Sequence, residues 1–327
     1  MPIGRSLAFV LAGMLAIAPA LSSQAQEKYP SKPVRVLVGV NPGGATDVLA
    51  RIVAHQLSDA MDGNFVVENR PGAGGTIAAN EAAKAQADGS TLLLSAPTVM
   101  VVSPYLYKNL PFSPKEDFAP VSLVGAGPLV LAVNSSVPAR DLPELMRYLR
   151  DNPGKVSFGS GGQGTASHLT AELFGSRAGV EIVHVPYRGD GQALNDLLGG
   201  HVQLMFTAFS LLEPHVDAGK LRILATTALD RPSSVPQLPS LHESGLTGFE
   251  SFGWIGLYAP KGTPAGIIDQ LNNAWQERSR RPDVRKQLEA FGGTFPAVDT
   301  PAAFAAFQAQ EAERWASVIQ DAGVTAE

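Results

Sequence analysis

Residues 34–57 read VRVLVGVNPGGATDVLARIVAHQL, an apolar run that meets a glycine-rich loop and then opens directly onto a helical stretch. Residues 155–179 repeat the design as KVSFGSGGQGTASHLTAELFGSRAG. Because glycines remove side chains from both loops, backbone N–H groups and the positive helix ends face outward, an arrangement that favours an anion. Two such loops in one chain predict one acidic ligand held between two lobes.

Short apolar runs alternate with amphipathic stretches along the whole chain, the pattern of helices that cover a mostly parallel sheet. We therefore predict the α/β class. Strands are expected at Val34–Val40, Phe65–Glu68, Thr91–Ser95, Leu129–Asn134, Val156–Gly159, Ile182–Val185, Val202–Phe206, Leu221–Thr226 and Trp254–Ala259. The chain is expected to end in three helices, each with proline in its first turn, at Pro264–Ser279, Pro282–Phe291 and Pro301–Asp321.

The length of 327 residues exceeds the size at which single hydrophobic cores usually split, so two lobes are expected. The pattern loosens at residues 124–128 and again at 245–253, which predicts two crossings between the lobes. The first lobe would comprise residues 26–125 and 251–327, and the second residues 126–250. Two crossings make a hinge over a cleft, and a hinge allows closure on a ligand.

The first 25 residues are expected to be an export signal. Arg5 precedes an apolar run of 15 residues, Leu7 to Leu21, and small residues follow at Ser23-Gln24-Ala25. The run is shorter than the roughly 20 residues that a membrane span needs. We expect cleavage after Ala25 and a mature periplasmic protein that does not span the membrane.

The composition excludes several classes of function. The chain has no cysteine, so disulfides, thiol catalysis and cysteine-bound metals are ruled out. Its formal net charge of −5 argues against a nucleic-acid partner and requires that an anion be bound by local dipoles. The six histidines show no dense metal-ligand spacing, and no nucleophile elbow surrounds Ser160. We therefore expect no catalytic residue, no metal and no cofactor.

In the first loop, we expect the amides of Gly43, Gly44 and Ala45 to bind a ligand carboxylate while Thr46 and Asp47 hold the helix start. Helix capping and an i,i+4 ion pair with Arg51, worth about 0.3–0.5 kcal/mol, would explain Asp47 without any ligand. A further glycine loop at residues 69–76 either shapes the same cleft or merely turns the chain.

The second loop contains Gly159-x-Gly161-x-x-Gly164, formally a dinucleotide-binding fingerprint between a strand and a helix. An NAD-type oxidoreductase would need an acidic residue about 20 positions further on, at the tip of the next strand. That strand instead runs into Pro186-Tyr187-Arg188-Gly189 before Asp190. A tight turn capped by Thr165 explains the glycines as well as a cofactor does.

A carboxylate-binding loop accommodates both the glycines and the nearby hydroxyls. On that interpretation, the second loop contributes Gly161, Gly162, Gln163, Gly164 and Thr165 to the ligand site. Thr98, which follows the expected strand Thr91–Ser95, would line the wall.

Several motifs together give the chain a family resemblance over nearly its whole mature length. They are Tyr29-Pro30-x-Lys32-Pro33-Val34-Arg35, Pro42-Gly43-Gly44 with Asp47 and Ala50-Arg51, Val67 to Gly75, Asp88 to Leu93, Asp117 to Val121, Gly164-Thr165-x-Ser167-His168-Leu169, His184 to Gly189, and Trp254 to Pro264. As a set they resemble the periplasmic solute-binding receptors of the Bordetella uptake gene (Bug) type, which serve tripartite tricarboxylate transporters.

The resemblance implies a type II periplasmic binding protein, a monomer of two α/β lobes that closes on a small organic acid and delivers it to a membrane permease. Backbone amides and ordered waters at residues 43–47 and 161–165 would hold the carboxylate, because a bridging water keeps most of the hydrogen-bond enthalpy. Two alternatives are an exported sensor that presents its closed form to a signalling partner, and an NAD-type oxidoreductase.

One departure from the family concerns the expected strand at residues 200–207. Relatives commonly carry aspartates there, whereas this chain has Gln203 and Thr207. If Thr207 faces the cleft, a negative charge has been replaced by a hydroxyl. The hypothesis is that an ammonium-bearing ligand is disfavoured and a plain carboxylic acid is preferred, dicarboxylic or, given Phe206 and Phe209, aromatic. The alternative is that both phenylalanines are core residues.

Overall fold

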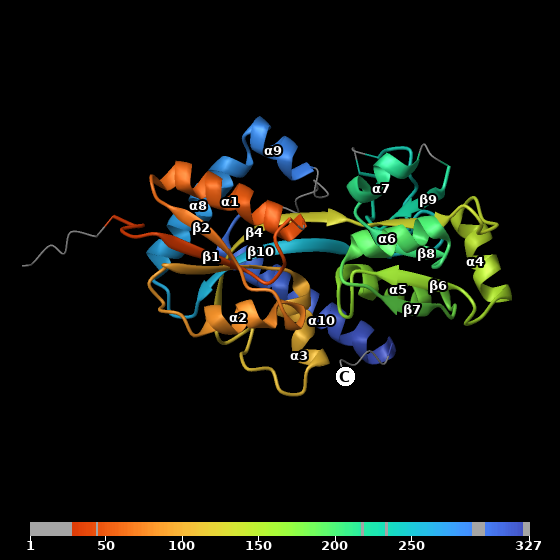
Figure 1. Cartoon of the computed structure of the whole chain (residues 1–327), viewed down its shortest axis with the longest axis horizontal. Helices are drawn as coiled ribbons and strands as arrows, with labels where there is room; N and C mark the ends of the chain where they lie inside the picture. The colour runs from red at the N-terminus through yellow and green to blue at the C-terminus, as the bar shows by residue number, and fades with distance from the viewer. Residues whose placement is uncertain (1–27, 44, 217–218, 233–234, 290–297, 323–327) are drawn as a thin grey trace, which may run out of the picture.

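The structure, a computed structural model, describes residues 28–43, 45–216, 219–232, 235–289 and 298–322. It contains two five-stranded sheets, which lie side by side with β4 and β10 running from one toward the other (Figure 1). The first has the order β2-β1-β3-β10-β4 and the second the order β7-β6-β8-β5-β9. The predicted α/β class with two lobes is therefore confirmed.

The strands of the first sheet come from residues before 129 and after 251, and those of the second from between these positions. The first sheet holds β1 (Val34–Val38), β2 (Phe65–Asn69), β3 (Thr91–Ser95), β4 (Phe118–Pro128) and β10 (Phe252–Pro260). The second holds β5 (Val130–Asn134), β6 (Ser157–Ser160), β7 (Val183–Pro186), β8 (Leu204–Thr207) and β9 (Leu221–Thr226).

The α-helices alternate with the strands along most of the chain. They are α1 (Ala45–Met61), α2 (Thr76–Ala83), α3 (Ser103–Leu106), α4 (Leu142–Asp151), α5 (Ala166–Ala178), α6 (Asp190–Gly199), α7 (Phe209–Val216), α8 (Ala265–Ser279), α9 (Pro282–Glu289) and α10 (Pro301–Ala322). A 3-10 turn at Ala73–Gly75 and a π-helical turn at Thr98–Val102 complete the described elements.

The two sheets share one arrangement of strand directions. In each, three parallel strands are followed by one antiparallel strand, β10 or β5, and then by a last strand parallel to the first three. The antiparallel strand is in each case the one that arrives from the other lobe. The similarity of the two strand-loop-helix segments therefore extends to the strand directions of the whole sheets that contain them.

Both faces of the first sheet are covered by helices, which is why β1 and β3 are almost entirely apolar. Alternate side chains of β1 enter two separate cores, one shared with α1, α8 and α9 and the other with α2, α3 and α10. The second sheet is covered by α4 and α5 on one face and by α6 and α7 on the other. Each lobe therefore has its own buried support for the loops at its strand ends.

The segment at residues 124–128, expected to be a loose boundary, is instead the second half of the long strand β4. Its glycines pair with β10, with Gly125 opposite Ile255 and Gly127 opposite Gly253. The sequence concealed this strand because glycine and proline have low strand propensity, which pairing along the length of β10 overrides.

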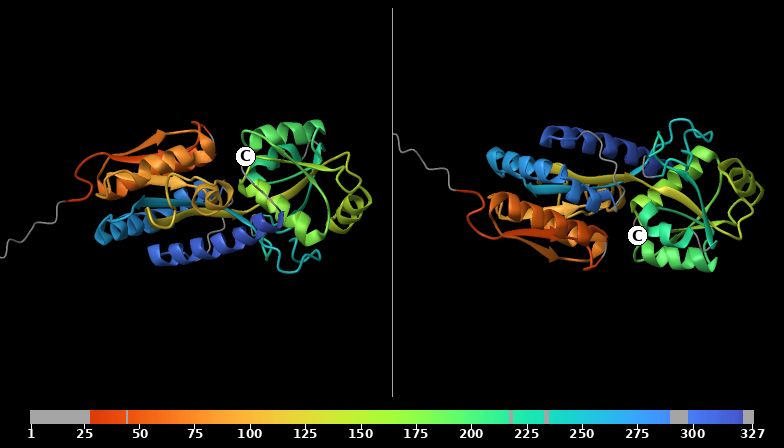
Figure 2. Two further views of the ribbon diagram at one scale, coloured as in Figure 1. Left: turned by 90° about the horizontal axis from the view of Figure 1, so that it is seen from below. Right: turned by 90° about the horizontal axis from the view of Figure 1, so that it is seen from above.

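The chain passes between the sheets through one buried cluster of hydrogen bonds. The Leu129 amide, between β4 and β5, donates to the Thr227 hydroxyl at 2.8 Å, and that hydroxyl donates to the Ser251 carbonyl at 2.6 Å. Helix α10 also crosses the divide, since it packs on β4 and on α5, and Figure 2 shows it reaching the second lobe. These contacts link the two lobes.

Candidate functional site

A cavity of about 270 Å³ lies between the two sheets, at the ends of strands from both. It is small for a ligand pocket and its wall is mostly apolar, with a few hydroxyls and one carboxylate. Among the described residues it is lined by Thr46, Leu49, Ala96, Pro97, Thr98, Gly125 to Leu129, Thr165, Ala166, Ser167, Asp190, Ala208, Gly253, Trp254, Ile255 and Leu288.

The first glycine loop is held by Asp47, whose carboxylate is turned toward its own lobe. Asp47 is 2 % exposed and accepts hydrogen bonds from the Gly43 amide at 2.9 Å, Asn69 Nδ2 at 2.8 Å and the Arg51 guanidinium at 3.0 Å. Burial alone would raise the pKa of Asp47, but these hydrogen bonds outweigh it and bring the pKa to about 2. The loop is therefore anchored by an ionised side chain, and Thr46 beside it lines the cavity.

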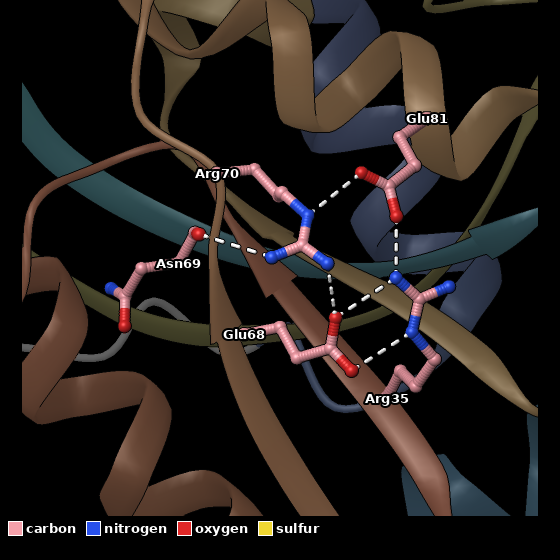
Figure 3. A network of polar contacts seen from close by, with 5 residues as sticks. All are labelled: Arg35, Glu68, Asn69, Arg70 and Glu81. Atoms are coloured by element: carbon pink, nitrogen blue, oxygen red, sulfur yellow. Dashed lines mark hydrogen bonds and ion pairs between the residues drawn. The ribbon is translucent and has the colours of Figure 1, made fainter.

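The glycine loop at residues 69–76 supports the first loop and does not line the cavity among the residues described. Its start is fixed by a network in which Arg35 and Arg70 each bind both Glu68 and Glu81 (Figure 3). The hydrogen bond from Arg35, opposed by partial burial, lowers the pKa of both glutamates. Asn69, at the edge of this network, donates a hydrogen bond to Asp47 and so connects the network to the first loop.

The second glycine loop uses most of its own amides. Three of the predicted glycines donate within or just behind the loop: Gly161 to Ser167 Oγ at 3.0 Å, Gly162 to Ser160 Oγ at 3.2 Å and Gly164 to His168 Nδ1 at 3.0 Å. Thr165 caps α5 by accepting from the His168 amide. Ala166 and Ser167, in the first turn of α5, line the cavity, and helix geometry provides their amides with no intrahelical acceptor.

Two histidines support this loop from behind. The rings of His168 and His184 stack with centroids 3.7 Å apart, and His184 Nε2 lies 2.6 Å from Ser160 Oγ. Burial, reinforced by the neighbouring His168, lowers the pKa of His184 to about 3, so this ring is neutral. His168 accepts at Nδ1, which requires that nitrogen to be unprotonated. The stack is thus an uncharged platform for the loop.

Gly164 is the point at which the second loop touches the first lobe. A Cβ placed there would lie 2.6 Å from Leu106 Cδ1 and 3.3 Å from Val102 Cγ1, both in the segment that follows β3. Its φ of +71° is also one that side-chain-bearing residues rarely adopt. The lobes therefore meet directly beside the cavity, and glycine permits the approach.

Asp190 is a functional candidate that the sequence analysis noted only as lying in the wrong place for a ribose. It is the first residue of α6, lines the cavity, and accepts hydrogen bonds from Ser167 Oγ at 2.8 Å and Thr207 Oγ1 at 3.3 Å. Burial raises its pKa, while the hydrogen bonds act in the opposite direction. The sequence signal was a lone Asp-Gly after Gly189, which local pattern alone does not distinguish from a helix start.

Thr207 does not line the cavity, contrary to the expectation that it faces the cleft. It is 1 % exposed, and its hydroxyl donates to Asp190. Phe206 is fully buried against Phe174, with ring centroids 5.6 Å apart, and Phe209, the first residue of α7, is partly buried and packs against the core on that face of the second sheet. The core interpretation of these phenylalanines holds, and the aromatic wall of the cavity is Trp254.

The structure brings the predicted site residues to one place but gives them different positions. Thr46, Thr98 and Thr165 line the cavity. The predicted residues that do not line it are Gly43, Ala45, Asp47, Gly161, Gly162, Gln163, Gly164 and Thr207, and Gly44 lies outside the described residues. Among the residues described, no three His, Asp or Glu side chains come together as a metal site.

Two α/β lobes joined by crossing strands, with a small cavity between them onto which a helix of each lobe opens, define a two-lobed solute-binding protein. The sequence profile of the tripartite tricarboxylate transporter family receptor (TctC) matches residues 49–324. The chain therefore belongs to this receptor family, which is a family of binding proteins and not of enzymes.

Similar proteins are known from several bacteria. BugT of Bordetella pertussis is 38% identical over 298 residues, covering 91% of each chain. The R. palustris protein Rpa4515, solved with adipate, is 32% identical with a TM-score of 0.81 and covers 91% of this chain and 100% of its own. MatC from Rhodopseudomonas palustris, solved with malate, is 31% identical with a TM-score of 0.78, covering 89% and 100%.

In the described part of the chain, no helix combines the length and the apolar character needed to cross a bilayer. The predictions of a Bug-type receptor and of a protein that is not an enzyme are confirmed by the family match and by the relatives.

Proposed function

We propose that the protein captures a small carboxylate-bearing ligand in the cavity between its lobes and delivers it to a membrane transporter. The observation that carries this proposal is that the first turns of α1 and α5, one from each lobe, open onto the same small cavity. Helix N-termini favour negative charge, and two of them aimed at one space favour a carboxylate. Relatives solved with adipate and malate support the same chemistry.

Polar and apolar residues of the cavity wall would contact different parts of the ligand. The amides of Ala166 and Ser167 would donate to the carboxylate, directly or through water. The hydroxyls of Thr46, Thr98 and Thr165 would complete its hydrogen bonds, and the apolar wall would cover the ligand's carbon atoms.

The predicted glycines would contribute to the binding site mainly through the shape of the loops. The two lobes, residues 26–125 with 251–327 and residues 126–250, would close by a hinge at the crossing near Leu129 and Thr227. We place the mature protein in the periplasm after cleavage at about Ala25, on the strength of the leader sequence and of relatives described as periplasmic. Delivery to a permease follows from membership of a transporter receptor family.

Thermal unfolding of residues 26–327, refolded from denaturant to remove carried ligand, tests the proposal. The panel is mono-, di- and tricarboxylates, amino acids, aromatic acids and NAD. A ligand at a hundred times its Kd adds about 2.7 kcal/mol to the free energy of unfolding, which gives a clear rise in Tm. We expect one group of carboxylates to stabilise the protein. Stabilisation by NAD alone, or by no acid, would contradict the proposal.

A backbone variant makes the same experiment specific for the cavity. Ala166→Pro removes one amide donor at the first position of α5, where proline is tolerated, and Thr165 before it already has the extended conformation that proline requires. Losing one hydrogen bond to a charged group should weaken carboxylate binding about tenfold or more. Ala265→Pro, at the equivalent position of α8 and outside the cavity, is the matched control and should bind normally.

A further inference from the structure

The cavity that would hold an acidic ligand has an acidic side chain in its own wall. Asp190 lines the cavity, and its Oδ1 lies 2.8 Å from the hydroxyl of Ser167, another lining residue. No lysine, arginine or histidine lines the cavity among the residues described. Asp190 is therefore the one ionisable side chain of the described wall, and any ligand must be compatible with its carboxyl group.

The groups around Asp190 are arranged as donors to a carboxylate. The Ser167 hydroxyl accepts from the Gly161 amide and donates to Asp190 at 2.8 Å, and Thr165 Oγ1 lies 3.0 Å from the same hydroxyl. The Thr207 hydroxyl donates from the other side. Asp190 is also the first residue of α6, where the helix dipole favours negative charge. These contacts favour the ionised form and oppose the effect of burial.

Asp190 also occupies the place that the second glycine loop would offer to an anion. A Cβ at Gly161 would lie 2.7 Å from Asp190 Oδ1, so the glycine makes room for the protein's own carboxylate. The anion preference of this loop is thus already partly satisfied. The ligand carboxylate is left with the side of the cavity formed by α1 and the start of α5, and another part of the ligand faces Asp190.

We propose that Asp190 is a specificity-determining residue that selects a ligand bearing an ammonium group together with its carboxylate, in preference to a plain mono- or dicarboxylic acid. The inference rests on the proposed function, because it assumes that the cavity binds a carboxylate. A second ligand carboxylate facing Asp190 would meet a like charge in a space of low polarity, whereas an ammonium group would complete an ion pair.

This reverses the hypothesis drawn from Thr207. A hydroxyl does stand at position 207, but the wall still carries a carboxyl group, that of Asp190, to which Thr207 donates a hydrogen bond. The sequence could not show this, since the two residues are 17 positions apart and meet only through the packing of α6 on β8.

Calorimetric titration with matched ligand pairs tests the proposal. The pairs are glutamate with glutarate, alanine with propionate and 4-aminobutyrate with butyrate, whose members differ only in an ammonium group. We expect the refolded wild-type protein to bind the ammonium member at least tenfold more tightly in the pair that fits the cavity. Equal binding of both members, or preference for the plain acid, would overturn the inference while leaving the proposed function intact.

Asp190→Asn sharpens the test, with Asp151→Asn, at the exposed end of α4 in the same lobe, as the control for removing one negative charge. Asp190→Asn should weaken the ammonium ligand at least tenfold and leave the plain acid unchanged or more tightly bound, whereas Asp151→Asn should change neither. Equal weakening of both members would show a structural role and overturn the inference. If neither these pairs nor any carboxylate of the thermal-unfolding panel binds the wild-type protein, the proposed function itself fails.

Discussion

The two glycine loops look alike in sequence and differ in what the surrounding protein does with them. The loop at residues 43–47 is held from inside its own lobe by Asp47, an ionised side chain with three kinds of donor around it. The loop at residues 161–165 bonds several of its amides internally, rests on stacked neutral imidazoles and touches the opposite lobe at Gly164.

The same glycine-rich strand-to-helix turn can therefore have different roles, which depend on the residues that surround it. In the first loop, the charge that satisfies the turn is that of Asp47, which does not line the cavity. In the second, the charge that faces the loop is Asp190, in the cavity wall. The loop at residues 43–47 is therefore suited to face a ligand anion. The loop at residues 161–165 is suited to contact the opposite lobe and to lie beside the carboxyl group of Asp190.

The largest effect should come from blocking closure at the second loop. In Gly164→Leu, the new side chain would enter the space of Leu106 and Val102, so the lobes could not approach as they do here. We expect the affinity for any stabilising carboxylate to fall at least a hundredfold, measured by calorimetric titration. The unliganded protein should lose about 1–2 kcal/mol of stability from the left-handed backbone alone.

Gly179→Leu is the matched control for that experiment. Gly179 lies at the C-terminal end of α5, the helix that follows Gly164, and has a φ of +63°. A Cβ at Gly179 would meet nothing within 4 Å. The control should show a similar backbone cost and unchanged affinity. Equal loss of affinity in both variants would show that backbone strain, and not contact between the lobes, explains the result.

A smaller effect is expected from removing the charge that anchors the first loop. The folded pKa of Asp47 is about 2, below its ordinary value of 3.8, so its ionisation stabilises the fold. By linkage this contribution is about 2 kcal/mol, fully present above pH 4 and lost as the pH falls toward 2. Urea unfolding should show Asp47→Asn less stable than wild type at pH 7, with the gap closing below pH 4.

A gap between Asp47→Asn and wild type that stayed constant from pH 7 to pH 2.5 would contradict this account of Asp47. Asp59→Asn is a suitable control, because Asp59 lies on the exposed side of the same helix and half of its side chain is accessible. Its free energy of unfolding should remain close to that of the wild type across the range.

The smallest effect should come from the network of Figure 3, which supports the first loop from a distance. Glu81→Gln removes one carboxylate from Arg35 and Arg70, and because all these side chains are partly exposed the cost should stay below about 1 kcal/mol. The loss should shrink in high salt. Ligand affinity should not change, and a tenfold change would show that the loop at residues 69–76 shapes the cavity directly.

Most of the fold could be predicted from the sequence because most helices and strands are marked by patterns of neighbouring residues. Strands β3 and β9 were predicted with their exact bounds, and the other predicted strands and helices lie within two residues of the observed ones, except that the predicted helix end at Phe291 lies outside the described residues. Strand β4 was missed because its second half is rich in glycine and ends in proline, and only its pairing with β10 makes it a strand. At the site, Thr46, Thr98 and Thr165 were predicted from their places after strands and at helix starts, and they line the cavity.

The sequence by itself determined the α/β class, the repeated strand-loop-helix design and the receptor family, because periodicity, glycine placement and short motifs are properties of neighbouring residues. The tertiary structure was needed to show that Asp190, in the cavity wall, meets Ser167 and Thr207, that Gly164 touches Leu106, and that Asp47 binds groups of its own lobe. Contacts of this kind join residues far apart in the chain or depend on how a side chain is turned. They are set by how helices pack on a sheet, which no local pattern records.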